Sequence, residues 1–197
     1  QKPDKTIANG DESIATGIAQ CDGQLVTILD FEKIVAELAP ETTIQASEVD
    51  AMGDRPLNEA PIVIAEDSVL LRKMIDDSLE RAGFTNIRNF GNGKEAWDYL
   101  SSIKDEPDLY ERVKLIITDI EMPQMDGHRL TKLIKDDSRL KKIPVIIFSS
   151  LIDDQMRRKG KELGADDQLA KPEIGRLVAT MDKLLDEYEE KRAKARG

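Results

Sequence analysis

The sequence predicts an α/β fold, a parallel sheet with helices on both faces, and three observations support this prediction. Short runs such as "IVIA" and "VIIF" are apolar at every position, which is typical of parallel strands covered on both sides. Amphipathic segments that suit helices lie between these runs. The two kinds of segment alternate between residues 61 and 191, as expected of a doubly wound sheet.

Each expected strand follows in chain order. The strands are "IVIA" (62–65), "TNIRNF" (85–90), "LII" (115–117), "VIIF" (145–148) and "QLA" (168–170). The first, third and fourth are continuously apolar. The second and the fifth carry weaker patterns, and they complete the alternation with helices.

The first expected helix has the clearest signals. Ser68 is a good N-cap and Gly83 is a suitable terminator. Between them, Leu71, Ile75 and Leu79 share one face at a spacing of four. The later helices are expected in "NGKEAWDYLSSI" (92–103), "HRLTKLIKDD" (128–137), "DDQMRRKGKELGA" (153–165) and the segment that starts at Glu173.

Composition and charge exclude several classes of protein. The net charge of −10 repels phosphate backbones, so no nucleic-acid partner is expected. No apolar run is long enough for a transmembrane helix, so no membrane insertion is expected. The single cysteine, Cys21, cannot form an intrachain disulfide, which fits a cytoplasmic location. The single histidine, His128, is expected at an exposed loop or first-turn position.

Composition also divides the chain. Residues 41–60 lack hydrophobic periodicity and contain glycine and proline, so they are expected to form a linker. Residues 61–191 then form the main domain, and residues 192–197 a basic tail. Residues 1–40 form a separate N-terminal segment. Since the sequence does not start with methionine, the chain is expected to be a fragment or a processed product.

Reactive side chains follow four of the expected strands. Glu66 and Asp67 follow the first, Asp119 the third, Ser149 the fourth and Lys171 the fifth. The carboxyl ends of parallel strands lie at one edge of a sheet, so these groups are expected to converge there. Crowded carboxylates need a cation, and Mg²⁺ suits a site with few carboxylates, waters and a phosphate.

Such a site suits phosphoryl transfer. A carboxylate can attack phosphorus and carry the group as an acyl phosphate. The metal and a lysine would neutralise the charge on the phosphoryl oxygens, and a hydroxyl would donate a hydrogen bond to one of them.

Four motifs resemble the signatures of the response-regulator receiver domain, the CheY-like family with a flavodoxin-like (βα)5 fold. They are "IAEDS", "IITDIEMPQMDG", "PVIIFSSL" and "GADDQLAKP". Successive intervals of 52, 30 and 22 residues separate Asp67, Asp119, Ser149 and Lys171, which suits the family. The resemblance implies that Asp119 is the phosphoacceptor, that Ser149 hydrogen-bonds the phosphoryl group, and that Lys171 pairs with Asp119 or its phosphate. It also implies a cis peptide between Lys171 and Pro172.

The resemblance further implies a Mg²⁺ site. Asp67 would bind the ion directly and Glu66 through water, and Asp119 would also be a ligand. Glu121 would contribute its backbone carbonyl.

Two positions depart from the family pattern. Gln168 stands where the family usually has a tyrosine or phenylalanine that swings inward on activation. Glu121 replaces a commonly smaller or neutral residue, with Leu151 as its neighbour along the path of the hydrolytic water. An altered lifetime of the phosphate is therefore expected.

The first forty residues have a pattern of their own. "QLVTILD" (24–30) is expected to form a strand and "FEKIVAEL" (31–38) a helix, with no sheet of their own. This remnant resembles the closing strand and helix of a CheW-like coupling domain. A coupling domain followed by a receiver resembles the CheV class of chemotaxis adaptors. The alternative is an ordinary N-terminal extension.

The resemblance implies a phosphoacceptor signalling domain in a two-component system. The expected partners are a histidine kinase of the chemotaxis type and, through the coupling domain, the chemoreceptor array. The expected location is the cytoplasm, including receptor arrays. The domain would not be an enzyme beyond its own Mg²⁺-dependent phosphotransfer and dephosphorylation. The alternatives are a phosphatase with an aspartate nucleophile and a pseudo-receiver that only binds partners.

Overall fold

The computed structural model describes residues 15–21, 24–29, 46–53, 55–150 and 152–196. The chain divides into two compact units, Gln1–Thr43 and Ile44–Gly197. The described part of the chain contains no helix that is long and apolar enough to cross a membrane.

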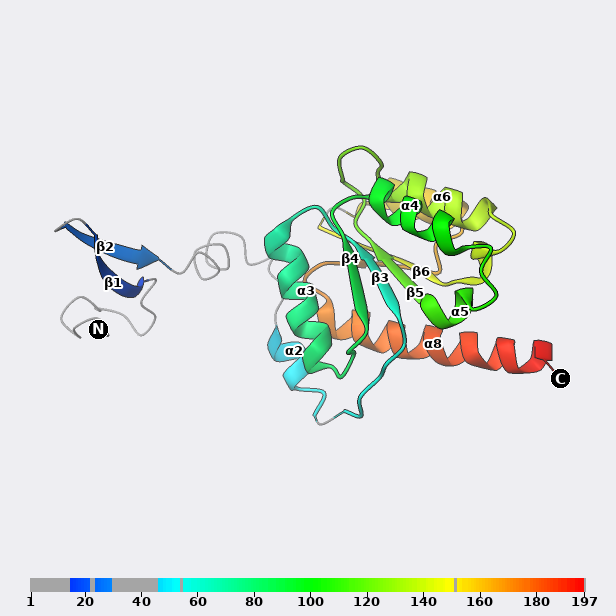
Figure 1. The fold of residues 1–197 in the computed structure, drawn as a ribbon, viewed down its shortest axis with the longest axis horizontal. Coiled ribbons are helices and arrows are strands. Elements are labelled where there is room, and N and C mark those ends of the chain that lie inside the picture. The colour runs from blue at the N-terminus through cyan, green and yellow to red at the C-terminus, as the bar shows by residue number, and fades with distance from the viewer. Residues whose placement is uncertain (1–14, 22–23, 30–45, 54, 151, 197) are drawn as a thin grey trace. The chain divides into compact units, whose positions relative to one another are not determined.

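The smaller unit contains a two-stranded antiparallel sheet (Figure 1). Strand β1 (Ala15–Cys21) pairs with β2 (Gln24–Leu29). The strand expected at 24–30 is therefore present, but the expectation that it has no sheet partner is wrong. Strand β1 reads "ATGIAQC", in which alanine and glycine have low β-propensity, so its pattern was weak. The helix expected at 31–38 lies outside the described residues.

The larger unit is built on a five-stranded parallel sheet, which confirms the predicted fold class. Its strands are β3 (Ile62–Ala65), β4 (Ile87–Phe90), β5 (Leu115–Thr118), β6 (Val145–Ser149) and β7 (Asp167–Ala170). Their spatial order is β4-β3-β5-β6-β7. The strand order thus reverses next to β3, and a parallel sheet of this kind binds ligands at such a point.

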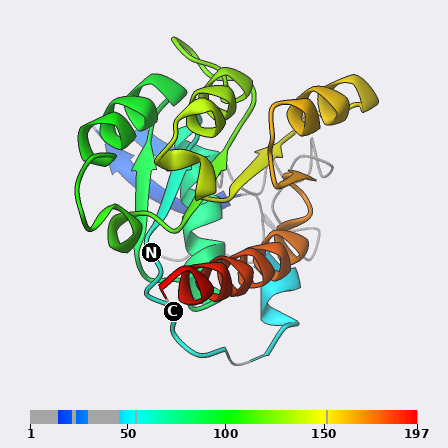
Figure 2. The same cartoon turned by 90° about the vertical axis from the view of Figure 1, so that its right-hand side faces the viewer.

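Helices cover both faces of this sheet (Figures 1 and 2). They are α3 (Val69–Arg81), α4 (Gly93–Ile103), α5 (Leu109–Arg112), α6 (Gly127–Asp136), α7 (Asp154–Glu162) and α8 (Ile174–Arg196), with a 3-10 turn, η3 (Leu140–Lys142). One core lies between the sheet and α3 with α8, and a second lies between the sheet and α4 with α6. The expected N-cap is confirmed, because the Ser68 hydroxyl accepts a hydrogen bond from the Leu71 amide.

A short helix, α2 (Ala46–Asp50), occupies part of the expected linker. Val49 is 2% exposed and belongs to the core under α3 and α8. Residues 46–50 therefore belong to the packed part of the larger unit, in contrast to the linker expected from composition at 41–60. Five residues are too few to display a helical period, so the burial of Val49 depends on contacts that the local sequence does not reveal.

Polar contacts hold this helix and the residues that follow it in place. The Arg55 guanidinium bonds both carboxylate oxygens of Asp182, at 2.6 and 2.7 Å. A carboxylate oxygen of Glu48 accepts a hydrogen bond of 2.9 Å from the amide of Gly175, in the first turn of α8. The segment before the sheet is thus fixed to α8.

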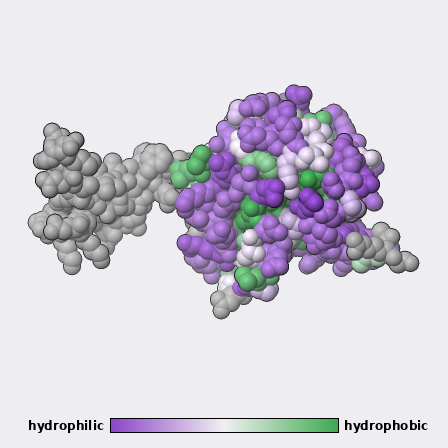
Figure 3. Space-filling view, viewed as in Figure 1, coloured by the Kyte–Doolittle hydropathy of each residue, from purple (hydrophilic) through white to green (hydrophobic). Residues whose placement is uncertain are grey.

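Helix α8 also extends through the expected basic tail, since it runs to Arg196. Arg192 pairs with Glu111 at 2.8 Å and lies over the ring of Tyr110. The first residue of the expected tail is therefore part of the domain. Elsewhere, most of the face seen in Figure 3 carries hydrophilic residues, with small separate hydrophobic areas.

Candidate functional site

The carboxyl ends of the central strands surround a pocket of about 360 Å³. Its lining includes all six residues predicted from the sequence, namely Glu66, Asp67, Asp119, Glu121, Ser149 and Lys171. Ser68, Leu71 and Ser150 complete it. Groups that are far apart in the chain thus meet at one edge of the sheet, as the parallel topology requires.

Lys171 lies between two of the acids that line this pocket. Its Nζ atom is 2.7 Å from a carboxylate oxygen of Asp119 and 2.7 Å from one of Glu66. The side chain is almost completely buried. Burial alone lowers the pKa of the Lys171 ammonium, but the carboxylates of Asp119 and Glu66 outweigh burial and leave the pKa raised. Lys171 is therefore a fixed positive charge between two acids.

Glu66 is the more deeply buried of these two acids. Burial raises the pKa of its carboxyl group, and the charge of Lys171 opposes that rise. The carboxylate also accepts a hydrogen bond of 3.2 Å from the Ser68 amide. Burial outweighs these donors, so the pKa of the Glu66 carboxyl group stays raised.

Strand β5 holds Asp119 in a fixed position. The Asp119 amide donates to the Ala65 carbonyl at 2.9 Å, which extends the β3–β5 ladder by one bond. The carboxylate is oriented at both oxygens, because the Ile120 amide donates to Oδ1 at 2.6 Å and Lys171 bonds Oδ2. Asp119 keeps 7% exposure within the pocket, so a small reactant can reach it.

Three carboxylates form a group that fits a divalent cation. Oxygens of Glu66, Asp67 and Asp119 all lie within 4.8 Å of one another. Carboxylate oxygens are the ligands that Mg²⁺ prefers, and exposed Asp67 leaves one side of the group open to water. The donor set therefore suits a hard ion that retains several waters. Glu121 lines the same pocket, whereas the role of its carbonyl stays a prediction.

Gly127 allows the loop after Asp119 to fold back. A Cβ atom at Gly127 would lie 1.8 Å from the Asp119 carbonyl oxygen. The Gly127 amide donates to the Ile120 carbonyl at 2.9 Å, which closes the loop. Only glycine permits this approach, and α6 begins at the same residue.

One implied feature is wrong. No peptide bond in the described part of the chain is cis, so the bond between Lys171 and Pro172 is trans. Since X-Pro bonds differ by only about 0.5–1 kcal/mol between the two forms, the sequence alone does not determine the isomer. Leu151, the second residue expected near the hydrolytic water, lies outside the described residues.

The side chain of Gln168 lies in the interior, at 8% exposure. Its Nε2 atom donates to the Arg157 carbonyl at 2.8 Å, and the Arg157 guanidinium donates back to the Gln168 carbonyl at 3.3 Å. The amide also faces Gly160, where a Cβ atom would lie 2.4 Å from Gln168 Oε1. In place of an aromatic ring, β7 thus presents an amide that is bonded to α7.

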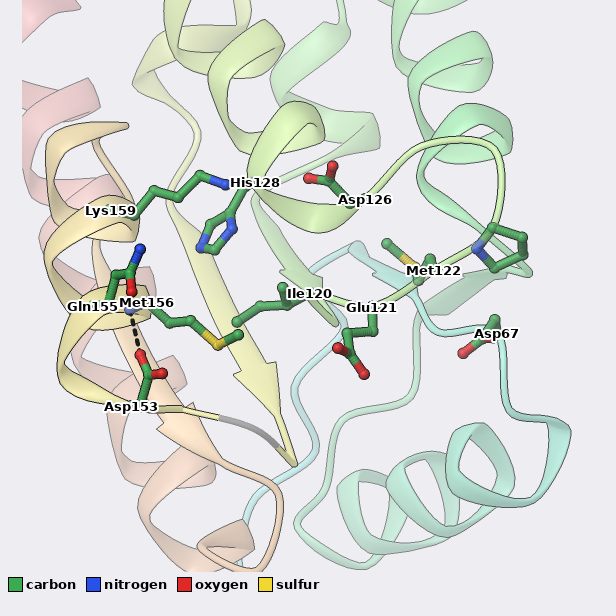
Figure 4. Close-up of a pocket in the computed structure, with 11 residues that line it drawn as sticks. Asp67, Ile120, Glu121, Met122, Asp126, His128, Asp153, Gln155, Met156 and Lys159 are labelled. Atoms are coloured by element: carbon green, nitrogen blue, oxygen red, sulfur yellow. Dashed lines mark hydrogen bonds between the residues drawn. The ribbon is translucent and has the colours of Figure 1, made fainter.

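His128 is buried, at 4% exposure, which corrects its expected exposed position. It lies in the first turn of α6, beside a cleft of about 590 Å³ that includes Asp67 and Glu121. Figure 4 shows its ring pointing into this cleft, toward Met156. Burial lowers the pKa of His128, and the positive charge of Lys159 lowers it further. The sequence did not predict this burial, because a single polar residue on a helix does not by itself distinguish a buried position from an exposed one.

Comparisons with known proteins agree with this geometry. A family model described as "Response regulator receiver domain" matches residues 62–182. Chemotaxis protein CheV2 of Helicobacter pylori is 32% identical over 168 residues, which cover 82% of this chain and 50% of that protein. A gliding motility regulatory protein of Myxococcus xanthus is 30% identical over 179 residues, 87% of this chain and 20% of that protein. The chain spans about half the length of the CheV relatives it matches.

Solved structures show the same fold. The signal receiver domain of a histidine kinase from Syntrophus aciditrophicus is 33% identical with a TM-score of 0.56, and the match covers 65% of this chain and 91% of that one. Chemotaxis protein CheY4 of Vibrio cholerae is 26% identical with a TM-score of 0.53, over 64% of this chain and 99% of that one.

Proposed function

The chain belongs to the response regulator receiver family, and from this premise we propose that Asp119 accepts a phosphoryl group from the phosphohistidine of a histidine kinase. The observation that carries the proposal is the position of Lys171, within 2.7 Å of both Asp119 and Glu66 in one open pocket. A fixed cation between carboxylates is suited to a reaction that delivers a dianionic group to one of them.

The transfer is a displacement at phosphorus. The Oδ2 atom of Asp119 attacks the phosphorus atom, and the bond between phosphorus and the imidazole nitrogen of the donor breaks. The donor nitrogen keeps the electron pair of that bond. Lys171, which already bonds Oδ2, stays close enough to pair with the new phosphoryl oxygens. Ser149 ends β6 in the same pocket, where its hydroxyl group can donate to one of those oxygens.

The carboxylates of Glu66, Asp67 and Asp119 would hold a magnesium ion, and the Glu121 carbonyl would be a further oxygen ligand. When bound, the ion supplies positive charge that neutralises the phosphoryl oxygens. Glu66 would act through water. The Ile120 amide and Lys171 hold the Asp119 carboxylate in place for attack on phosphorus.

Glu121 is proposed to influence how long the phosphate survives. Its side chain is exposed and lines the pocket around Asp119, where the hydrolytic water must enter. Exchange of Glu121 for Asn is expected to change the dephosphorylation rate, and an unchanged rate would contradict this role.

The wider role is a chemotaxis adaptor. The support for it is the similarity to chemotaxis protein CheV2 of Helicobacter pylori. On this proposal the N-terminal segment derives from a CheW-like coupling domain, the kinase is of the chemotaxis type, and the protein works in the cytoplasm at receptor arrays. The domain acts on no external substrate beyond its phosphodonor.

A phosphatase with an aspartate nucleophile is not favoured. Such enzymes usually carry a second aspartate two residues after the nucleophile as the general acid, and here that residue is Glu121. A pseudo-receiver is not favoured either, since the acids and Lys171 are all in place.

One experiment tests the proposal directly. The full chain is incubated with acetyl phosphate and Mg²⁺, and its intact mass is measured. One added phosphate is expected in the natural chain and none in Asp119→Asn, while Asp98→Asn, on the exposed surface of α4, serves as the control. A phosphate retained by Asp119→Asn would reject the assignment, and turnover of a phosphomonoester would favour the phosphatase.

A further inference from the structure

A further cavity lies at the opposite edge of the sheet from Asp119. It has a volume of about 580 Å³ and is bounded by α5, by η3 and by the last turns of α8. Its residues Tyr110, Lys142 and Asp166 each precede a strand, whereas Asp119 follows one. The cavity is therefore formed by the amino ends of the strands, and the phosphoryl-transfer site does not use it.

The lining of this cavity is strongly basic although the chain carries a net charge of −10. Lys141, Lys142, Lys191 and Arg192 face it, and its one acid is Asp166. That carboxylate is already satisfied, because it bonds the Lys135 ammonium at 2.7 Å and the Val145 amide at 2.8 Å. The positive charge of the cavity therefore exceeds what its own acid compensates.

Two of the cations are available for a ligand. In the part of the chain that the structure describes, neither Lys141 nor Lys142 makes an ion pair, and both are exposed. By contrast, Arg192 pairs with Glu111 at 2.8 Å, and Lys191 approaches Glu187 at 3.5 Å. The adjacent ammonium groups of η3 thus form the anion-attracting side of the cavity.

Part of the cavity lining is aromatic. The rings of Tyr110 and Tyr188 meet edge to face, with centroids 6.1 Å apart and planes at 64°. The Arg192 guanidinium lies over both, 5.4 Å from the Tyr110 centroid and 5.8 Å from the Tyr188 centroid. A planar group can pack against this surface, because aromatic and guanidinium faces both stack on rings.

A buried hydroxyl group lacks a partner at the same place. Tyr188 is 5% exposed, and its Oη atom has no hydrogen-bond partner among the described residues. Burial raises the pKa of this hydroxyl, so it stays protonated at neutral pH and remains a donor. Buried polar groups without partners are rare in proteins and often mark a place where a ligand or water binds.

We propose that this cavity binds a multiply charged anion that carries a flat ring, which is the chemical class of nucleotides. The anionic part contacts Lys141 and Lys142, and the ring packs against the aromatic surface, where it can accept a hydrogen bond from Tyr188. The volume lies within the range of about 300–1,000 Å³ that is usual for small-molecule sites. An acidic peptide is the competing ligand, and it has no need of the ring surface.

Calorimetric titration of the full chain with ATP tests the proposal. EDTA is present throughout, so that no metal bridges the nucleotide to Asp119. Binding is expected for the natural chain and for Asp119→Asn. The double variant Lys141→Gln/Lys142→Gln is expected to bind at least tenfold more weakly. Lys132→Gln is the matched control, because that lysine is exposed on α6 and pairs with Asp136.

Three further probes identify what is recognised. Tripolyphosphate supplies the charge without a ring, and adenosine supplies the ring without the charge. Both are expected to bind at least tenfold more weakly than ATP, and Tyr188→Phe is expected to weaken ATP binding while urea denaturation verifies that it is folded. Equal affinity for tripolyphosphate and ATP would overturn the ring contact. Tight binding of an oligoglutamate peptide without ATP binding would overturn the proposal in favour of an acidic segment.

Discussion

The ammonium group of Lys171 lies 2.7 Å from a carboxylate oxygen of Glu66, at a point where both side chains are almost completely buried. The same ammonium group bonds Asp119. One cation thus compensates two acids, and the three residues are expected to respond to substitution as a unit.

Substitution of Lys171 by Met should lower the free energy of unfolding by about 3–5 kcal/mol, because it leaves two buried carboxylates without a cation. Glu66→Gln should cost clearly less, since Lys171 keeps Asp119 as its partner. Urea denaturation followed by circular dichroism measures both. Equal losses in the two variants would contradict the shared-cation arrangement.

Magnesium should stabilise the folded chain through the three carboxylates. At a concentration of 100 times its dissociation constant, the ion should raise the free energy of unfolding by about 2.7 kcal/mol. Asp67→Asn should lose most of this gain. Asp77→Asn, an exposed acid on α3 that pairs with Lys73, should retain it. A similar response of both variants to Mg²⁺ would argue against the carboxylate site.

Gly127→Ala should destabilise the domain and suppress phosphorylation, because the new methyl group would lie 1.8 Å from the Asp119 carbonyl oxygen. Forced shifts of this kind typically cost about 1–3 kcal/mol. Gly91→Ala provides the comparison, since the nearest atom to its Cβ would be 3.5 Å away. Thermal unfolding and the acetyl phosphate assay measure the two effects, and a fully active Gly127→Ala would be incompatible with the close approach.

Gly160 and Gln168 should be energetically coupled. Alanine is favoured over glycine within a helix by about 1 kcal/mol, but at Gly160 its methyl group would lie 2.4 Å from the Gln168 amide. Gly160→Ala should therefore stabilise a Gln168→Ala background and should bring no such gain in the natural chain. A double-mutant cycle measures this coupling, and additive effects would show that the amide moves away freely.

His128 should make stability depend on pH near neutrality. Burial lowers the pKa of His128, so below its usual value the unfolded chain binds a proton that the folded chain excludes. Stability should therefore fall as the pH drops from about 7.5 to about 5.5, by at most about 1.4 kcal/mol per pH unit. Because His128 is the only histidine, His128→Leu should remove this component. Titration of Glu66, whose pKa is raised, contributes equally to the natural chain and to His128→Leu. If the two proteins had the same dependence of stability on pH, the assignment to His128 would be refuted.

The sequence predicted the parallel framework and the group of side chains that meets at one edge of the sheet. Continuous apolar runs fixed β3, β5 and β6, and the residue after each run then identified Glu66, Asp119 and Ser149. These predictions succeeded because strand ends in a parallel sheet are determined by topology.

Features that depend on packing could not be predicted in this way. The burial of Val49 and His128 around their neighbours follows from contacts between elements distant in the chain. The bond from Gln168 to α7 is of the same kind, since the family pattern indicated only that an aromatic ring is missing. Strand β1 was missed because its residues have low β-propensity.

The hydrogen bond between Glu48 and the first turn of α8 affects the choice of the first residue when a shortened protein is expressed. A fragment that begins at residue 62, the limit of the family match, would lack Glu48, Val49 and Arg55, and it would leave apolar surface on α3 and α8 open to water. We expect such a fragment to aggregate more readily than one that starts near residue 44. We therefore expect the shortest stable fragment of this protein to start before the first residue of the family match.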